Sequence, residues 1–219
     1  MDVLLVVGLA FVGLALLMAL GFFLPVVPPR LPGPRMLIDE LVPLYSFGEH
    51  HEIRIAAPVA RVWQATLAVT AREIRLFRLL TWLRSPRWPG GARESILNPA
   101  PDRPILEVAL RSGFLLLGED EEREIVVGML VCCNKPTPAA SKDDFLSRPG
   151  SLARAVMSFH AIGEGGGTTR LITQTRISTS DATSRRRFAA YWRVIHPGSA
   201  FIRLMWLRAI RDRAERPAA

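Results

Sequence analysis

An uncharged apolar run near the start of the chain constrains its fold more than any other feature. Residues 3–27, between Asp2 and Arg30, contain no charged residue and consist mostly of Leu, Val, Ala, Phe and Gly. Since a helix rises about 1.5 Å per residue, about 25 residues are enough to cross a hydrocarbon core about 30 Å thick. We therefore predict a transmembrane anchor over residues 1–28.

Two other interpretations of this run are weaker. A cleaved signal peptide needs a basic n-region and a small-x-small cleavage site, whereas here Asp2 precedes the run and prolines follow it. A buried core helix would keep some polar face, which this run lacks. Because Arg30 and Arg35 follow the run, the positive-inside rule predicts a single-pass protein of the cell membrane with a cytoplasmic C-terminal domain.

The rest of the chain divides into a spacer and one domain. Prolines are dense after the anchor, and they favour an extended, stiff segment, so we predict a Pro-rich linker over residues 29–48. Residues 49–215 are enough for one domain with its own core. The net charge of +8 suits an anionic leaflet or a nucleic acid. The Arg residues are scattered and no nucleic-acid motif is present, so we expect the membrane, and no nucleic acid, as a partner.

Hydrophobic spacing predicts an α+β domain. Ile53 and Ile55 alternate with charged residues, as in a half-buried strand, and Pro58 suits the start of a helix. The expected elements after that helix are a helix over 73–83, a helix or strand over 105–110, strands over 113–118 and 124–133, a hairpin over 154–178 and a helix from 181 to 214. Residues 136–150 are expected to form a loop and an irregular segment. Pro197 is expected to kink or break the last helix.

Three segments resemble the START-like (SRPBCC, Bet v 1-like, polyketide cyclase/dehydrase-related) superfamily. Residues 53–63 (IRIAAPVARVW) are similar to its first strand, Ala-Pro turn and helix start, and residues 165–171 (GGGTTRL) to its late hairpin. Residues 185–199 (RRRFAAYWRVIHPGS) resemble the ending of actinobacterial members. The resemblance implies a helix-grip fold, in which a curved antiparallel sheet wraps around a long C-terminal helix. In this chain a transmembrane helix would precede it.

The resemblance also implies a hydrophobic cavity between the sheet and the last helix. Members of the superfamily bind sterols, lipids and polyketides, and a minority are cyclases. We therefore expect membrane-anchored binding of a hydrophobic small molecule, a lipid or a polyketide-like compound, without covalent chemistry. The alternatives are an aromatase/cyclase-type enzyme with Tyr191 or a histidine as general acid, and a non-catalytic scaffold in a membrane assembly whose cavity is filled by its own side chains.

The acidic residues, the histidines and the glycine run do not indicate a particular reaction. The acidic residues cluster in predicted turns, and the four histidines have no metal-ligand spacing, so we expect no catalytic residue, metal or cofactor. The glycine run 163–167 joins two strands and is read as a hairpin turn rather than a phosphate loop.

The candidate ligand contacts lie on predicted apolar faces, where ordinary core packing is the competing interpretation. They are Trp63, Phe77, Phe114, Met129, Met157, Phe159, His160, Arg176, Tyr191 and Trp192. Tyr191, His160 and Arg176 are the predicted polar contacts. His160 alternates out of phase with Met157 and Phe159, so it lies inside the cavity only if they do not.

Overall fold

The computed structural model describes residues 32–77, 98–131, 139–150 and 153–217, together with residues 8, 12, 13, 16, 81, 95 and 96. The elements among these residues are α2 (Leu37–Leu41), β1 (Phe47–Ile55), α3 (Val59–Ala68), α5 (Ile105–Arg111), β2 (Leu115–Asp120), β3 (Glu124–Val131), α6 (Lys142–Ser147), β4 (Ala153–Gly165), β5 (Thr168–Thr179) and α7 (Ala182–Ala214). The strands form one antiparallel sheet in the order β1-β5-β4-β3-β2.

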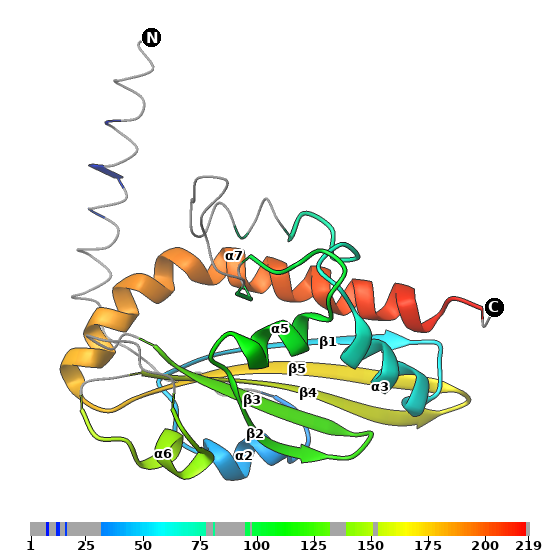
Figure 1. Cartoon of the computed structure of the whole chain (residues 1–219), viewed down its shortest axis with the longest axis horizontal. Helices are drawn as coiled ribbons and strands as arrows, with labels where there is room; N and C mark the ends of the chain where they lie inside the picture. Colours follow the sequence, from blue (N-terminus) through cyan, green and yellow to red (C-terminus); the bar gives the residue numbers. More distant parts are fainter. Residues whose placement is uncertain are drawn as a thin grey trace.

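The sheet is covered on both faces. Figure 1 shows α7, α3 and α5 on one side of the curved strands and α2 and α6 on the other. We call the α7 side the inner face and the α2 side the outer face. This arrangement confirms the predicted α+β fold with a curved antiparallel sheet and a long C-terminal helix.

Strand alternation assigns each side chain of β4 and β5 to one face. Met157 and Phe159 of β4 pack into the core beneath α7, whereas Val156 packs with the residues around α2. Register pairs Met157 with Thr175 and Val156 with Arg176, so the odd residues of β5 face inward and the even ones outward. Because both faces are covered, β5 is buried along almost its whole length.

The hairpin and the terminal helix form where the sequence predicts them. Gly165, Gly166 and Gly167 turn the chain between β4 and β5 with φ values of 86°, 58° and 73°, which glycine adopts without steric cost. Asp181 caps α7 because its Oδ1 accepts a hydrogen bond from the Ser184 N–H at 2.8 Å. Pro197 lies within α7, and the helix continues through it. The N-terminal half of α7, orange in Figure 1, is bent.

Part of the predicted linker belongs to the folded body. Met36, Ile38 and Val42 are buried in the outer-face cluster, and β1 already begins at Phe47. We call residues 32–46 the strap, because they cross the outer face before entering β1. The compact part of the chain therefore begins before residue 49. The prolines set the conformation of this segment, but its apolar residues attach it to the sheet.

Two other local predictions differ from the structure. Residues 142–147, within a segment expected to be irregular, form α6, whose cap Ser141 accepts a hydrogen bond from the Asp144 N–H at 3.1 Å. Residues 71–76 form turns rather than the start of a helix, and most of the rest of that predicted helix lies outside the described residues. The Ser141 cap starts α6, whereas the Thr70 N–H and hydroxyl both donate hydrogen bonds to Glu73 in the turn.

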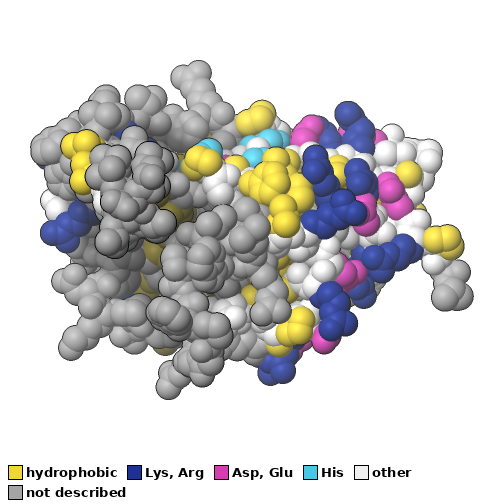
Figure 2. Space-filling model, turned by 90° about the horizontal axis from the view of Figure 1, so that it is seen from above, with side chains coloured by type: hydrophobic (Ala, Val, Ile, Leu, Met, Phe, Trp, Pro, Cys, Tyr) yellow, Lys and Arg dark blue, Asp and Glu magenta, His cyan; other side chains and the backbone are white. Residues whose placement is uncertain are grey.

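The surface on the α7 side is mixed in character. Figure 2 shows Lys and Arg side chains interspersed with Asp and Glu toward the C-terminal end of α7, next to a hydrophobic patch. Arg213 of this helix pairs with Glu73 at 2.9 Å.

The predicted anchor, residues 1–28, lies outside the described residues except for positions 8, 12, 13 and 16, which are helical. Across the part of the chain that the structure describes, no helix has both the length and the apolar character needed to cross a membrane.

Candidate functional site

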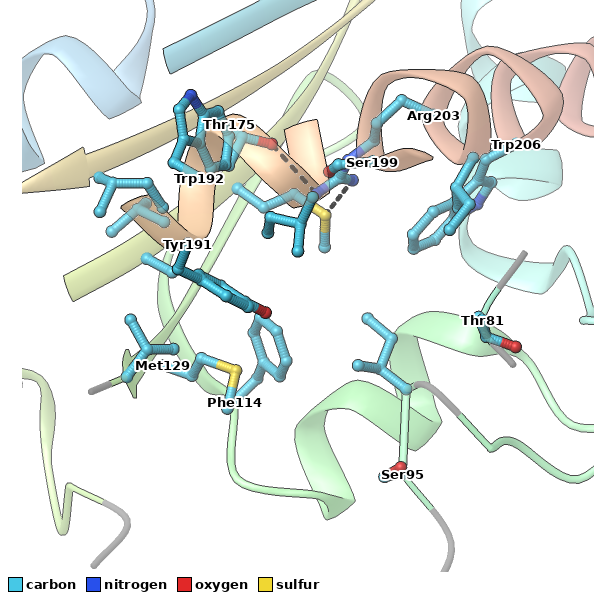
Figure 3. Close-up of a pocket in the computed structure, with 18 of the residues that line it drawn as sticks. Thr81, Ser95, Phe114, Met129, Thr175, Tyr191, Trp192, Ser199, Arg203 and Trp206 are labelled. Atoms are coloured by element: carbon cyan, nitrogen blue, oxygen red, sulfur yellow. Dashed lines mark hydrogen bonds between the residues drawn. The ribbon is translucent and has the colours of Figure 1, made fainter. Parts of the chain in front are cut away.

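A cavity of about 510 Å³ lies between α7, the inner face of the sheet and the segment before β2 (Figure 3). Its walls are mostly apolar, and its polar lining residues are few: Thr81, Ser95, Ser112, Thr175, Ser199 and Arg203, together with the Tyr191 hydroxyl. The volume falls within the usual range of small-molecule sites, about 300–1,000 Å³. An apolar interior with a few polar groups is the ordinary form of such a site.

Six of the ten predicted contacts line this cavity. They are Phe77, Phe114, Met129, Met157, Tyr191 and Trp192. In Figure 3, Met129, Phe114 and Tyr191 lie together on one side of the cavity, and Trp206 lies on the other. The candidate contacts on β3 and α7 therefore lie on the inward faces, whereas on β4 the candidates included residues of both faces.

Trp63 and Phe159 lie in the core and do not line the cavity. Both are almost completely buried in the cluster beneath α7. The ring of Phe159 packs against Trp206, with centroids 5.0 Å apart. Phe159 therefore supports a cavity wall from behind, which is the core-packing role that the sequence left open.

His160 lies on the outer face, outside the cavity. It faces away from Met157 and Phe159, as alternation predicts, and its Nδ1 is 3.8 Å from Oε2 of Glu124. Burial lowers the pKa of His160 and raises the pKa of Glu124. Glu124 also accepts hydrogen bonds from the Leu37 N–H at 2.6 Å and the Ile38 N–H at 3.3 Å, so Glu124 attaches the strap to the sheet.

Arg176 also lies on the outer face. Its guanidinium donates to the Val42 carbonyl at 3.1 Å, to Oδ1 of Asp39 at 2.5 Å and to Oε1 of Gln174 at 2.9 Å, and it lies 4.8 Å from the centre of the Tyr45 ring. These partners are residues of the strap and a neighbour on the same strand. Arg176 therefore attaches the strap to the sheet and does not contact the cavity.

The charged group at the cavity is instead a pair that the sequence reasoning missed. Arg203 of α7 lines the cavity, and its Nε lies 3.7 Å from Oε1 of Glu49 on β1. The same Oε1 accepts hydrogen bonds from Thr175 Oγ1 at 3.1 Å and from Ser199 Oγ at 3.2 Å. Arg203 also donates to Thr175 Oγ1 at 3.1 Å and to the Met157 sulfur (Figure 3).

Glu49 remains ionised despite its burial. Desolvation alone would raise the pKa of this carboxyl, but His51, the charge of Arg203 and the Thr175 hydroxyl outweigh burial and hold the pKa below its usual value. His51 Nε2 and His196 Nε2 each lie 3.7 Å from the other oxygen, Oε2. The cavity wall therefore contains a buried carboxylate paired with a guanidinium.

Strand alternation already contained the signal for Glu49. It lies an even number of residues from Ile53 and Ile55, so alternation places it on the inner face, together with His51. The sequence signal for the inward position of Arg203 is weaker, because one Arg beside Ile202 on a long amphipathic helix usually faces solvent.

Metal chemistry finds no support in this part of the structure. Among the described residues, no three His, Cys, Asp or Glu side chains are grouped so that they could hold a metal ion.

The antiparallel sheet in the order β1-β5-β4-β3-β2 and the long terminal helix that covers its inner face form a helix-grip arrangement. No protein-family model matches the chain, and no curated protein matches it. Among solved structures, TTHA0849 from Thermus thermophilus is similar over 76% of this chain and 96% of its own, with 10% identity and a TM-score of 0.30. The Zhui aromatase/cyclase from Streptomyces sp. R1128 is similar over 78% of this chain and 94% of its own, with 12% identity and a TM-score of 0.28.

Proposed function

We propose that this domain binds a hydrophobic small molecule, a lipid or a polyketide-like compound, in the cavity between the sheet and α7, without covalent chemistry. The observation that carries the proposal is the cavity itself, about 510 Å³ in volume and lined mainly by aromatic and aliphatic side chains. Removing apolar ligand surface from water at such walls contributes about 25 cal/mol per Å².

The lining favours binding over the alternatives. Its titratable side chains, as far as the structure describes them, are Tyr191 and Arg203, and no carboxyl or imidazole group is among them. Tyr191, the general acid of the aromatase/cyclase alternative, lines the cavity, but no carboxyl or imidazole that could act as a base beside it is among the described lining residues. A scaffold with a filled interior would have no cavity of this size.

Blocking the cavity tests the proposal. Ala155 on β4 lies on the cavity wall between Met129 and Ile177, so Ala155→Phe places a ring in the ligand space. Ala60→Phe adds the same ring to the exposed face of α3 as a control. We expect lipid extracted from the purified protein, identified by mass spectrometry, to be lost from the first variant and kept in the second. Equal ligand content in two folded variants, or none in the wild type, would contradict the proposal.

We further propose that residues 1–28 anchor the domain in the cell membrane, with the domain on the cytoplasmic side. The uncharged run and the basic residues after it support this proposal. The full chain should stay with membranes in high salt and at alkaline pH, whereas the chain from residue 29 onward should be released. Protease should reach the domain only from the cytoplasmic side. Release of the full chain by salt would exclude a spanning anchor.

A further inference from the structure

We infer that the cavity takes a neutral apolar molecule that carries a hydroxyl or carbonyl group, and that Glu49 makes it discriminate against the corresponding carboxylates. This inference rests on the proposed function and names the ligand class of the same site. It follows from where the two buried charges lie and from what surrounds them.

The charge of Arg203 is already compensated. Among the described lining residues Arg203 is the one cation, and Glu49 lies directly behind it, with Nε and Oε1 3.7 Å apart. The side chains of Glu49 and Arg203 are only 3% and 12% exposed, so solvent screens them little. A ligand at Arg203 therefore contacts the guanidinium, and the carboxylate of Glu49 behind it offsets the positive charge that the ligand experiences.

A carboxylate ligand would be disfavoured at such a pair. It would bring a second negative charge beside Glu49 and would lose its own hydration, and one guanidinium cannot compensate both anions fully. A hydroxyl or carbonyl group loses far less hydration, and it can accept a hydrogen bond from the Arg203 guanidinium. The apolar part of the ligand lies against the same apolar walls whether its polar end is a carboxylate or a neutral group. The polar end therefore determines which of the two ligands binds more tightly.

The nearby imidazoles do not line the cavity. His51 and His196 lie 3.7 Å from Oε2 of Glu49, the oxygen that receives no hydrogen bond. The two ligands are therefore compared at one fixed pH, pH 8.

Two probes of equal chain length test the inference. Dodecanol and dodecanoate compete with Nile red, a neutral fluorescent dye, for the full chain in detergent at pH 8. The wild type should bind dodecanol at least about tenfold more tightly than dodecanoate. Glu49→Gln keeps the shape and one oxygen acceptor but leaves Arg203 uncompensated, so affinity for dodecanoate should rise about tenfold while that for dodecanol changes little.

The same strand offers a matched control. Glu52 faces outward from β1, with its side chain 42% exposed, so Glu52→Gln removes an identical charge away from the cavity and should leave both affinities unchanged. Tighter binding of dodecanoate by the wild type, or an unchanged ratio in folded Glu49→Gln, would overturn the inference and leave the proposed function intact. If neither probe displaces the dye and no bound lipid is found, the proposed function fails as well. Should Glu49→Gln not fold, the wild-type ratio alone decides.

Discussion

Replacing Arg176 by Met should destabilise the domain without weakening ligand binding. The substitution keeps an apolar stem in the same space but removes every donor that Arg176 offers. Oε1 of Gln174 and the Val42 carbonyl would lose these hydrogen bonds, whereas Asp39, whose side chain is 36% exposed, can turn to water. Two buried acceptors left without these donors cost roughly 2–4 kcal/mol together, at about 1–2 kcal/mol each.

The loss is large enough to measure in a thermal scan. For a chain of this size, each kcal/mol lowers Tm by about 2–4 °C, so Tm should fall by roughly 5–15 °C. Limited proteolysis should show faster cleavage within the strap, and Nile red should bind as it does to the wild type. Arg203→Met is the counterpart, and it should weaken dodecanol binding. An Arg176→Met protein with unchanged Tm and lost ligand binding would refute the assignment of Arg176 to the outer face.

Two smaller predictions concern packing and pH. Gly128→Ala should cost about 1–3 kcal/mol in urea unfolding, because the added Cβ would lie 2.6 Å from Leu117 Cδ1 and 2.8 Å from Phe145 Cζ; a change near zero would contradict this close contact. Burial would raise the pKa of Glu73, but hydrogen bonds from Thr70 and Arg213 hold this pKa below its usual value. The ionised Glu73 carboxylate therefore stabilises the fold above the unfolded-state pKa, and this contribution is lost as pH falls through the folded-state pKa. Glu73→Gln should therefore lower the free energy of unfolding at pH 7 more than at pH 3, and an equal loss at both would refute this.

The fold was predictable where local chemistry and global packing agree. The glycine run 163–167 predicts a turn, and Ser180 or Asp181 offers a cap for the last helix; the structure places the turn at residues 165–167 and the cap at Asp181. The strap was not predictable in this way. Its prolines indicate an extended segment, but its attachment depends on Glu124 and Arg176, which lie far along the chain.

The residues that line the cavity were predictable where the sequence shows which face of a strand or helix points inward. Met157 alternates within a strand of clear period, so the sequence separated it from His160, but the packing beneath α7 decided which of the two faces inward. In β5 nearly every residue is buried, and burial on both faces erases the alternation that would separate Thr175 from Arg176. Arg176 was therefore assigned to the cavity by residue type, when only the register with β4 and β1 decides its face.

Arg176 and Arg203 show that the environment of a buried arginine decides its role. Each pairs with an acid and lies over an aromatic ring, Arg176 over Tyr45 and Arg203 over Trp206. Around Arg176 the neighbouring atoms belong to the strap, so its hydrogen bonds stabilise the docked strap. Arg203 borders a cavity of about 510 Å³, so its remaining surface faces ligand space. The acid beside it then sets which ligand charge is tolerated, because a compensated guanidinium attracts a neutral acceptor more readily than a second anion.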